Sequence, residues 1–196
     1  MNIVHYERRH NLNKFVSSKE QILNISKNII LKDGFSAFNM RMIADKCNIS
    51  VGAMYNYFKS KSDLIIATVE SIWLEILEPI NSKNEFNSFI DAVCCMFETI
   101  KNGNSKYSNF FSFHSLNFAS DDKQSGVEMM NIYFSKLKQK LILALNSDKN
   151  IRKNIFSDDF TAETFIDYIF DLIVSDLLKK QDNCNSLIIF IKNYIY

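Results

Sequence analysis

A chain of 196 residues can form one or two domains with hydrophobic cores, and its 47% hydrophobic and 23% charged residues exclude a wholly disordered protein. Only four glycines and one proline are present, too few for the turns of a sheet-rich fold, so the composition predicts an all-α protein. The net charge is +1, but residues 1–62 carry ten Lys/Arg and four Asp/Glu, a net +6, and the remainder carries −5. This division favours an anionic partner for the N-terminal third, nucleic acid or a membrane surface, with chance clustering as the alternative.

The first predicted helix follows a basic arm, residues 1–17, that shows no periodicity. From Ser18 onward, Ile22, Leu23, Ile29 and Ile30 recur at the spacing of one helix face. Ser17 or Ser18 can cap the start of this helix, and Gly34 occupies the position of a left-handed C-cap.

Two short helices follow, joined by a tight turn. Asn39 is the predicted cap of a helix from Met40 to Cys47, whose Ile43, Ala44 and Cys47 face inward. In the turn Asn48-Ile49-Ser50, Asn tolerates the left-handed conformation, and Ser50 caps a third helix from Val51 to Tyr57 with Met54 and Phe58 as inward anchors. Two short helices around such a turn describe a helix-turn-helix, whose second helix fits the major groove of DNA.

Longer helices are predicted for the rest of the chain. A fourth helix begins near Lys59 to Asp63 and ends at Pro79. Five more helices are predicted at 85–102, 105–118, 122–147, 158–180 and 185–196, with one of the breaks at Asn102-Gly103-Asn104, which makes about nine helices in all. The predicted organisation is an arm (1–17), a helix-turn-helix domain (18–64) and a helical C-terminal domain (65–196).

The helix-turn-helix segment resembles the DNA-binding signature of the TetR family of repressors. Arg41-Met42-Ile43-Ala44 matches its R-x-I-A core, Ile49-Ser50 matches the end of its turn, and Gly52 to Lys61 matches G-[TAS]-[LIM]-Y-x-[HY]-F-x-[SN]-K. Asn48 departs from the usual Gly, but Asn can adopt the same turn conformation. The resemblance runs from about Ser18 to Leu64, and the C-terminal two thirds match the family only in length and helical character.

The resemblance implies the residues that contact bases and phosphates. These are Asn39, Arg41, Ser50, Val51, Gly52, Ala53, Tyr55, Asn56, Tyr57 and Lys61. For Gly52, which costs about 1 kcal/mol relative to Ala inside a helix, close approach to DNA and tight packing between the second and third helices are both open explanations. For Ser50, the alternative to DNA contact is a capping role alone. For a tyrosine of the third helix it is packing of the ring in the core, and for Lys61 it is a solvated side chain.

The resemblance also implies a homodimer and a sensing pocket for a small molecule. The last two helices would form the dimer interface, through Phe165, Ile169, Phe170, Ile173, Leu177, Leu187, Ile188 and Ile191. The pocket candidates are the aromatic, Met and His residues Trp73, Met96, Phe97, Tyr107, Phe110, Phe111, Phe113, His114, Met129, Met130 and Tyr133. Ordinary core packing is the alternative for each of these pocket residues.

No catalytic, metal or cofactor motif stands out. The only histidines are His5, His10 and His114, and neither a P-loop nor a Rossmann fingerprint is present, so the sequence predicts no enzyme and no cofactor. Cys47, Cys94, Cys95 and Cys184 lack zinc-ligand spacing and are interpreted as free thiols in a reducing compartment. With neither a signal peptide nor an apolar run of membrane-spanning length, a cytoplasmic location without a membrane partner is expected.

The sequence therefore predicts a bacterial repressor that binds a palindromic duplex operator as a homodimer and is released by a small, hydrophobic effector. An activator of the same family remains an alternative. A helical ligand-binding or interaction module with a vestigial helix-turn-helix is another, and duplex DNA binding at physiological salt would distinguish it. The effector and the operator sequence are not predicted.

Overall fold

The computed structural model describes residues 18–34, 37–107 and 123–196, and for residues 123–130 it describes the backbone alone. Within these ranges the regular structure consists of eight α-helices, and the predicted all-α fold is confirmed. The helices are α1 (Lys19–Asp33), α2 (Met40–Lys46), α3 (Val51–Tyr57), α4 (Lys61–Asn81), α5 (Phe89–Lys106), α7 (Lys123–Ser147), α8 (Ala162–Leu178) and α9 (Asn185–Ile195). The predicted helix over 105–118 lies mostly outside the described residues.

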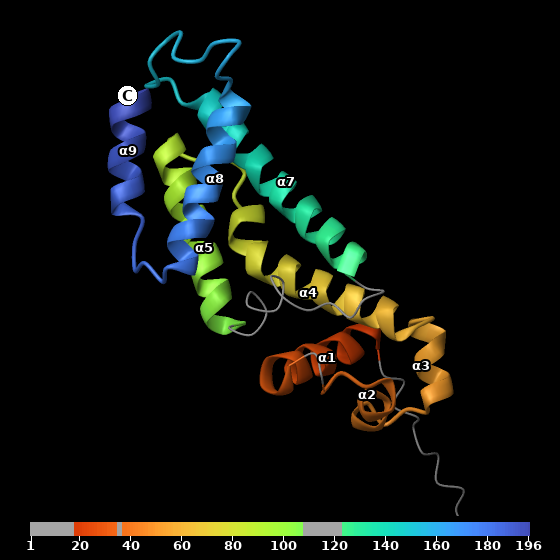
Figure 1. Ribbon diagram of the computed structural model, residues 1–196. Helices are drawn as coiled ribbons and strands as arrows, with labels where there is room; N and C mark the ends of the chain where they lie inside the picture. Colours follow the sequence, from red (N-terminus) through yellow and green to blue (C-terminus); the bar gives the residue numbers. More distant parts are fainter. Residues whose placement is uncertain (1–17, 35–36, 108–122) are drawn as a thin grey trace, which may run out of the picture.

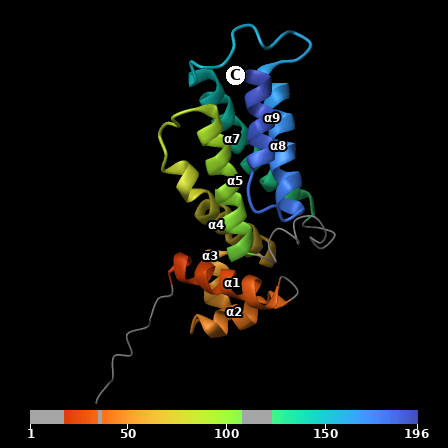
Figure 2. The ribbon, with the colours of Figure 1, turned by 90° about the vertical axis from the view of Figure 1, so that its left-hand side faces the viewer.

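The helices form two groups that α4 joins. Helices α1, α2 and α3 lie together at one end of the molecule, and α5, α7, α8 and α9 form an elongated bundle at the other (Figures 1 and 2). Helix α4 packs on α1 of the first group and on α5 and α7 of the second. The predicted domain boundary between residues 64 and 65 falls inside α4, so this helix is shared by the two groups.

The helix starts follow the predicted capping. The side chains of Ser18, Asn39 and Ser50 accept hydrogen bonds from backbone N–H groups in the first turns of α1, α2 and α3. Gly34 has φ of 73° after α1, and Asn48 has φ of 55° between α2 and α3. Both residues therefore have the positive φ that the sequence predicts for them, but the ψ of 177° at Gly34 differs from that of a left-handed C-cap.

Two predicted helix ends are wrong. Helix α4 passes Pro79 and ends at Asn81, because a proline three residues from the end removes only one of the last backbone hydrogen bonds. Helix α5 runs through the predicted break at Asn102-Gly103-Asn104 and ends at Lys106. Gly103 is buried against Ile76 of α4, so it serves the close approach of two helices and does not end one.

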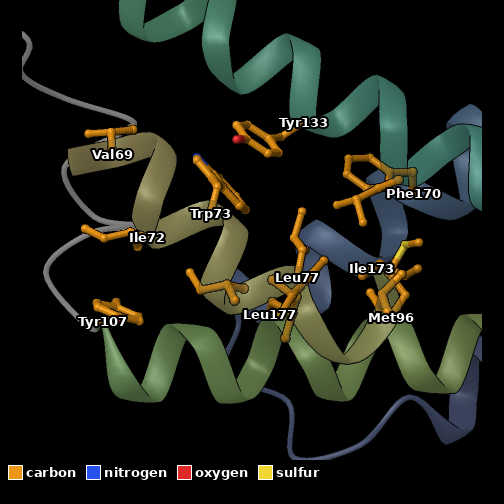
Figure 3. Packing of buried hydrophobic residues seen from close by; sticks show 14 of the residues in the cluster. Val69, Ile72, Trp73, Leu77, Met96, Tyr107, Tyr133, Phe170, Ile173 and Leu177 are labelled. Atoms are coloured by element: carbon orange, nitrogen blue, oxygen red, sulfur yellow. The ribbon is translucent and has the colours of Figure 1, made fainter. Parts of the chain in front are cut away.

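Aromatic side chains fill the centre of the bundle. The ring of Trp73 on α4 stacks on Tyr133 of α7 with centroids 5.6 Å apart (Figure 3). It also meets Phe134 edge-on at 6.0 Å. Phe134 in turn packs edge-on against Phe170 of α8 at 5.0 Å. Helices α4, α7 and α8 thus share one continuous aromatic core. In the described ranges, none of the helices has the length and apolarity needed to cross a membrane.

Candidate nucleic-acid interface

Helices α2 and α3 are held at a fixed angle by a closed turn and a shared core. The backbone N–H of Ile49 donates to the carbonyl of Ala44 at 3.0 Å, and that of Asn48 donates to Asp45 at 3.1 Å. Beneath the turn, Ile43 and Ala44 of α2 and Met54 of α3 are fully buried. The sequence assigned these three residues and Phe58 to the core, and the structure confirms the assignment.

The outer face of α2 and α3 carries the side chains predicted to contact DNA. Those that are exposed are Asn39, Arg41, Ser50, Gly52, Tyr55, Asn56 and Lys61, and those that are half-buried are Val51, Ala53 and Tyr57. Tyr55 leaves half of its surface in solvent although it is a large aromatic residue. None of the ten residues is fully buried in the protein.

The surroundings of Gly52 distinguish the two explanations for a glycine inside α3. A Cβ placed on Gly52 would have the Ser50 Oγ, 3.9 Å away, as its nearest neighbour, which is ordinary contact distance. Packing between α2 and α3 consequently gives no reason for a glycine here. Of the two explanations, close approach to DNA is the one that stays a prediction.

Exposed basic side chains lie in and directly after the helix-turn-helix. Arg41, Lys59 and Lys61 are exposed, and none of them has an ion-pair partner within the described part of the chain. Unneutralised Arg and Lys side chains attract the phosphates of a DNA backbone. The exposed polar groups of α3 lie among these charges, where they are able to reach base edges in a groove.

Residues 22–68 match the family model described as "Bacterial regulatory proteins, tetR family". This segment of the chain is thus a DNA-binding domain of the TetR type. This family consists of transcriptional regulators and not of enzymes. Its model covers about a quarter of the chain, the same region for which the sequence resemblance was found.

Similar proteins agree with this assignment over the same segment. The HTH-type transcriptional regulator YerO of Bacillus subtilis is 42% identical over 52 residues, which cover 26% of this chain and 18% of YerO. The HTH-type transcriptional repressor KstR of Mycobacterium tuberculosis is 35% identical over 51 residues, 26% of this chain and 23% of KstR. The chain thus matches less than a third of either relative's length.

A solved structure extends the likeness in fold to almost the whole chain. The reduced form of Escherichia coli NemR superposes with a TM-score of 0.60 and 16% identity, over 91% of this chain and 97% of NemR. At that identity, the likeness concerns the arrangement of the helices alone.

Some of the predicted ligand-binding residues are buried in the core, one lines a groove, and the side chains of the others lie outside the described residues. Trp73, Met96, Phe97 and Tyr133 are almost fully buried in the bundle core, as in the alternative of ordinary packing (Figure 3). Tyr107 lines a groove of 270 Å³ between α4 and α5, together with Glu75, Glu98 and Lys106. The side chains of Phe110, Phe111, Phe113, His114, Met129 and Met130 lie outside the described residues.

Most of the predicted interface residues of α8 and α9 are buried within the single chain, so their part in a dimer stays a prediction. Phe165, Ile169, Phe170, Ile173, Leu177, Leu187 and Ile191 are buried in the core of the single chain, and Ile188 is half-buried. The two helices instead expose Tyr168, Leu172, Leu178, Ile189 and Phe190. Sequence periodicity indicated too many apolar residues for one buried stripe, but it could not tell which stripe faces inward.

An apolar groove of 440 Å³ runs along this exposed face. Its walls come from α8, α9 and the turn before α8, and they consist of Phe160, Phe165, Tyr168, Asp171, Leu172, Ser175, Phe190 and Tyr194. Asp171 is the only charged side chain among these eight. A groove of this composition is suited to burial against another apolar surface.

A charged cluster at the junction of the two helix groups was missed by the sequence analysis. Glu75 of α4 accepts a hydrogen bond from Lys27 of α1 at 2.9 Å and another from Lys106 of α5. Burial raises the pKa of Glu75, but hydrogen bonds from Lys106, Lys27 and Tyr107 and the charge of Lys27 outweigh this effect and lower it to about 2. Lys27 and Glu75 are 48 residues apart, so no local pattern indicates the pair.

Among the described residues, no group of three or more His, Cys, Asp or Glu side chains is arranged to hold a metal ion.

Proposed function

We propose that this protein is a transcriptional repressor that binds a palindromic DNA operator as a homodimer and dissociates from it when a small effector binds. The observation that carries the proposal is the set of exposed polar and basic side chains on and beside α2 and α3. Among them is Gly52, where an added Cβ would meet no protein atom closer than 3.9 Å. A helix that exposes polar side chains, as α3 does with Tyr55 and Asn56, fits the major groove, where each base pair presents a distinct pattern of donors and acceptors.

A second copy of the chain is the proposed occupant of the groove on α8 and α9. Helix-turn-helix dimers read two half-sites about one helical turn apart, so each protomer supplies one recognition helix. The groove lies along the side of the bundle, whereas α3 lies at the end of the molecule (Figures 1 and 2). A two-fold axis along that side would keep both α3 helices at the same end. Its contacts would be Tyr168, Leu172, Ile189 and Phe190, and not the buried residues of the sequence prediction.

We place the effector in the bundle, where α4 connects its site to the DNA-binding helices. Helix α4 contacts α1, α5 and α7 and directly follows α3 in the chain, so a ligand that shifts α4 alters the position of α3. The aromatic and Met residues of the bundle favour an apolar ligand. Such an effector weakens DNA binding only if it prefers the state that does not bind DNA, by a coupling of typically 1–3 kcal/mol.

Fluorescence anisotropy with duplex DNA from upstream of the protein's own gene tests the proposal. We expect tight, sequence-selective binding whose log affinity falls linearly with log salt concentration. Weak binding of equal strength to every duplex would contradict the proposal and would favour a ligand-binding module with a vestigial helix-turn-helix. Transcription from the bound promoter then separates a repressor from an activator.

Two lysine variants show whether Lys61 contacts the DNA backbone. Lys61→Ala removes one phosphate contact per protomer, so the slope of log affinity against log salt should fall by roughly 1 per protomer. Lys149→Ala removes an equally exposed lysine at the far end of the bundle and should leave the slope unchanged. Equal slopes for all three proteins would show that Lys61, at the start of α4, does not contact the DNA backbone.

A further inference from the structure

Two cysteine thiols from distant parts of the chain meet beside α5. Cys94 lies on α5, and Cys184 immediately precedes α9, 90 residues later. Their sulfur atoms are 3.8 Å apart, with the Cys184 thiol directed at the Cys94 sulfur. A disulfide has an S–S distance of about 2.05 Å, so the two sulfurs must approach by less than the width of one atom to become bonded.

The two thiols differ in their access to solvent. Cys94 is partly exposed and Cys184 is buried. Burial, and then the neighbouring Cys94 sulfur, raise the pKa of Cys184 to about 12, so this thiol stays protonated at neutral pH. Cys94 is therefore the sulfur that a dissolved oxidant reaches first, and the Cys184 thiol lies next to it.

The position of Cys184 leaves its sulfur available. Helices α1 to α5 and α8 begin at Ser, Asn or Thr residues whose side chains cap the first turn, whereas Cys184 makes no capping hydrogen bond at the start of α9. The turn before it, residues 179–183, is exposed throughout. A small shift of Cys184 toward α5 therefore displaces no packed side chain of that turn.

We propose that Cys94 and Cys184 form a reversible dithiol–disulfide pair that hydroperoxides oxidise. The Cys94 sulfur attacks the O–O bond of the peroxide, giving a Cys94 sulfenic acid and releasing an alcohol, or water when the oxidant is hydrogen peroxide. The Cys184 sulfur then attacks the sulfenic sulfur, the S–S bond forms, and the hydroxyl leaves with the thiol proton as water. A dithiol reductant restores both thiols by exchange.

The disulfide would join α5 to the start of α9, one of the two helices that line the apolar groove. The chemistry belongs to the single chain and does not depend on DNA binding. Its test is therefore independent of the proposed function.

Peptide mapping of the purified protein after treatment with hydrogen peroxide tests the proposal. Trypsin releases Cys94 and Cys95 together in residues 84–101 and Cys184 in residues 181–192. After free thiols are blocked, we expect these two peptides to be cross-linked with the loss of two hydrogens, and to separate after reduction. Cys47 lies buried in the DNA-binding helices and should remain alkylatable after unfolding.

Three variants assign the bond. Cys95→Ser should still form the cross-link, because Cys95 also lies on α5 and is partly exposed but lines the groove beside Glu98. Cys184→Ser should lose the cross-link and accumulate a Cys94 sulfenic acid that a dimedone probe traps. Cys94→Ser should lose both products. Cross-links between two chains, a cross-link that needs Cys95, or a Cys94 that proceeds to sulfinic acid with Cys184 present would each overturn the proposal.

Discussion

Gly52 and Gly103 both lie inside helices, where glycine costs about 1 kcal/mol relative to alanine, but their surroundings are opposite. A Cβ on Gly103 would lie 2.6 Å from the Cγ2 and 3.0 Å from the Cγ1 of Ile76, a β-branched side chain with little freedom to turn away. Overpacking of a core typically costs 1–3 kcal/mol. Gly103→Ala should therefore destabilise the protein by about 1 kcal/mol or more in urea unfolding, despite the gain in helix propensity. Adding Ile76→Ala should make the glycine substitution favourable, and a Gly103→Ala protein more stable than the wild type would contradict the close packing of α4 on α5.

Gly52→Ala is the matched case in which stability and DNA binding move in opposite directions. Since a Cβ there meets nothing closer than 3.9 Å, the variant should gain up to about 1 kcal/mol of stability from helix propensity. The added methyl would face the DNA, so the anisotropy experiment should show affinity reduced by roughly tenfold or more. A variant that is both more stable and equally tight in binding would show that the α3 backbone does not approach the duplex.

At the scale of helices, local sequence signals predicted starts better than ends. Ser18, Asn39 and Ser50 cap their helices as predicted because a cap depends on a residue and the three that follow it. The end of α5 and the buried stripes of α8 and α9 depend on which helix lies opposite, which no local pattern contains. The ten predicted DNA-contact residues come from a dense family motif and are all at least partly exposed, whereas no such motif covers the bundle.

The ion pairs of Glu75 connect three helices, and their loss should have a defined pH dependence. Because the folded-state pKa of about 2 lies below the ordinary value of 4.5, the stabilisation is complete well above 4.5 and is lost as the pH falls toward 2. Glu75→Gln should lower the free energy of unfolding by about 1 kcal/mol near neutral pH, a modest value because the side chain is partly exposed. The difference from the wild type should shrink below pH 4.5.

Glu78→Gln is the control for this prediction, because Glu78 is exposed on the same helix and has no ion pair among the described residues. It should unfold like the wild type at every pH. If the Glu75→Gln difference persisted unchanged in acid, the loss would reflect packing and not charge.

At the scale of the whole molecule, the proposed repressor depends on a dimer, because one recognition helix contacts only half of a palindromic operator. Phe190 is half-exposed in the groove of α8 and α9, and a carboxylate there would be buried without a partner in a dimer. Phe190→Asp should therefore shift the protein from dimer to monomer in sedimentation equilibrium. It should also lower affinity for the full operator to that of a single half-site, while leaving the fold of the protomer intact by circular dichroism. Leu143→Asp changes an even more exposed apolar residue, on α7 and outside the groove, and should remain dimeric. If Leu143→Asp dissociated the dimer and Phe190→Asp did not, the interface would lie along α7, and the separation of the two α3 helices would have to be derived from that face.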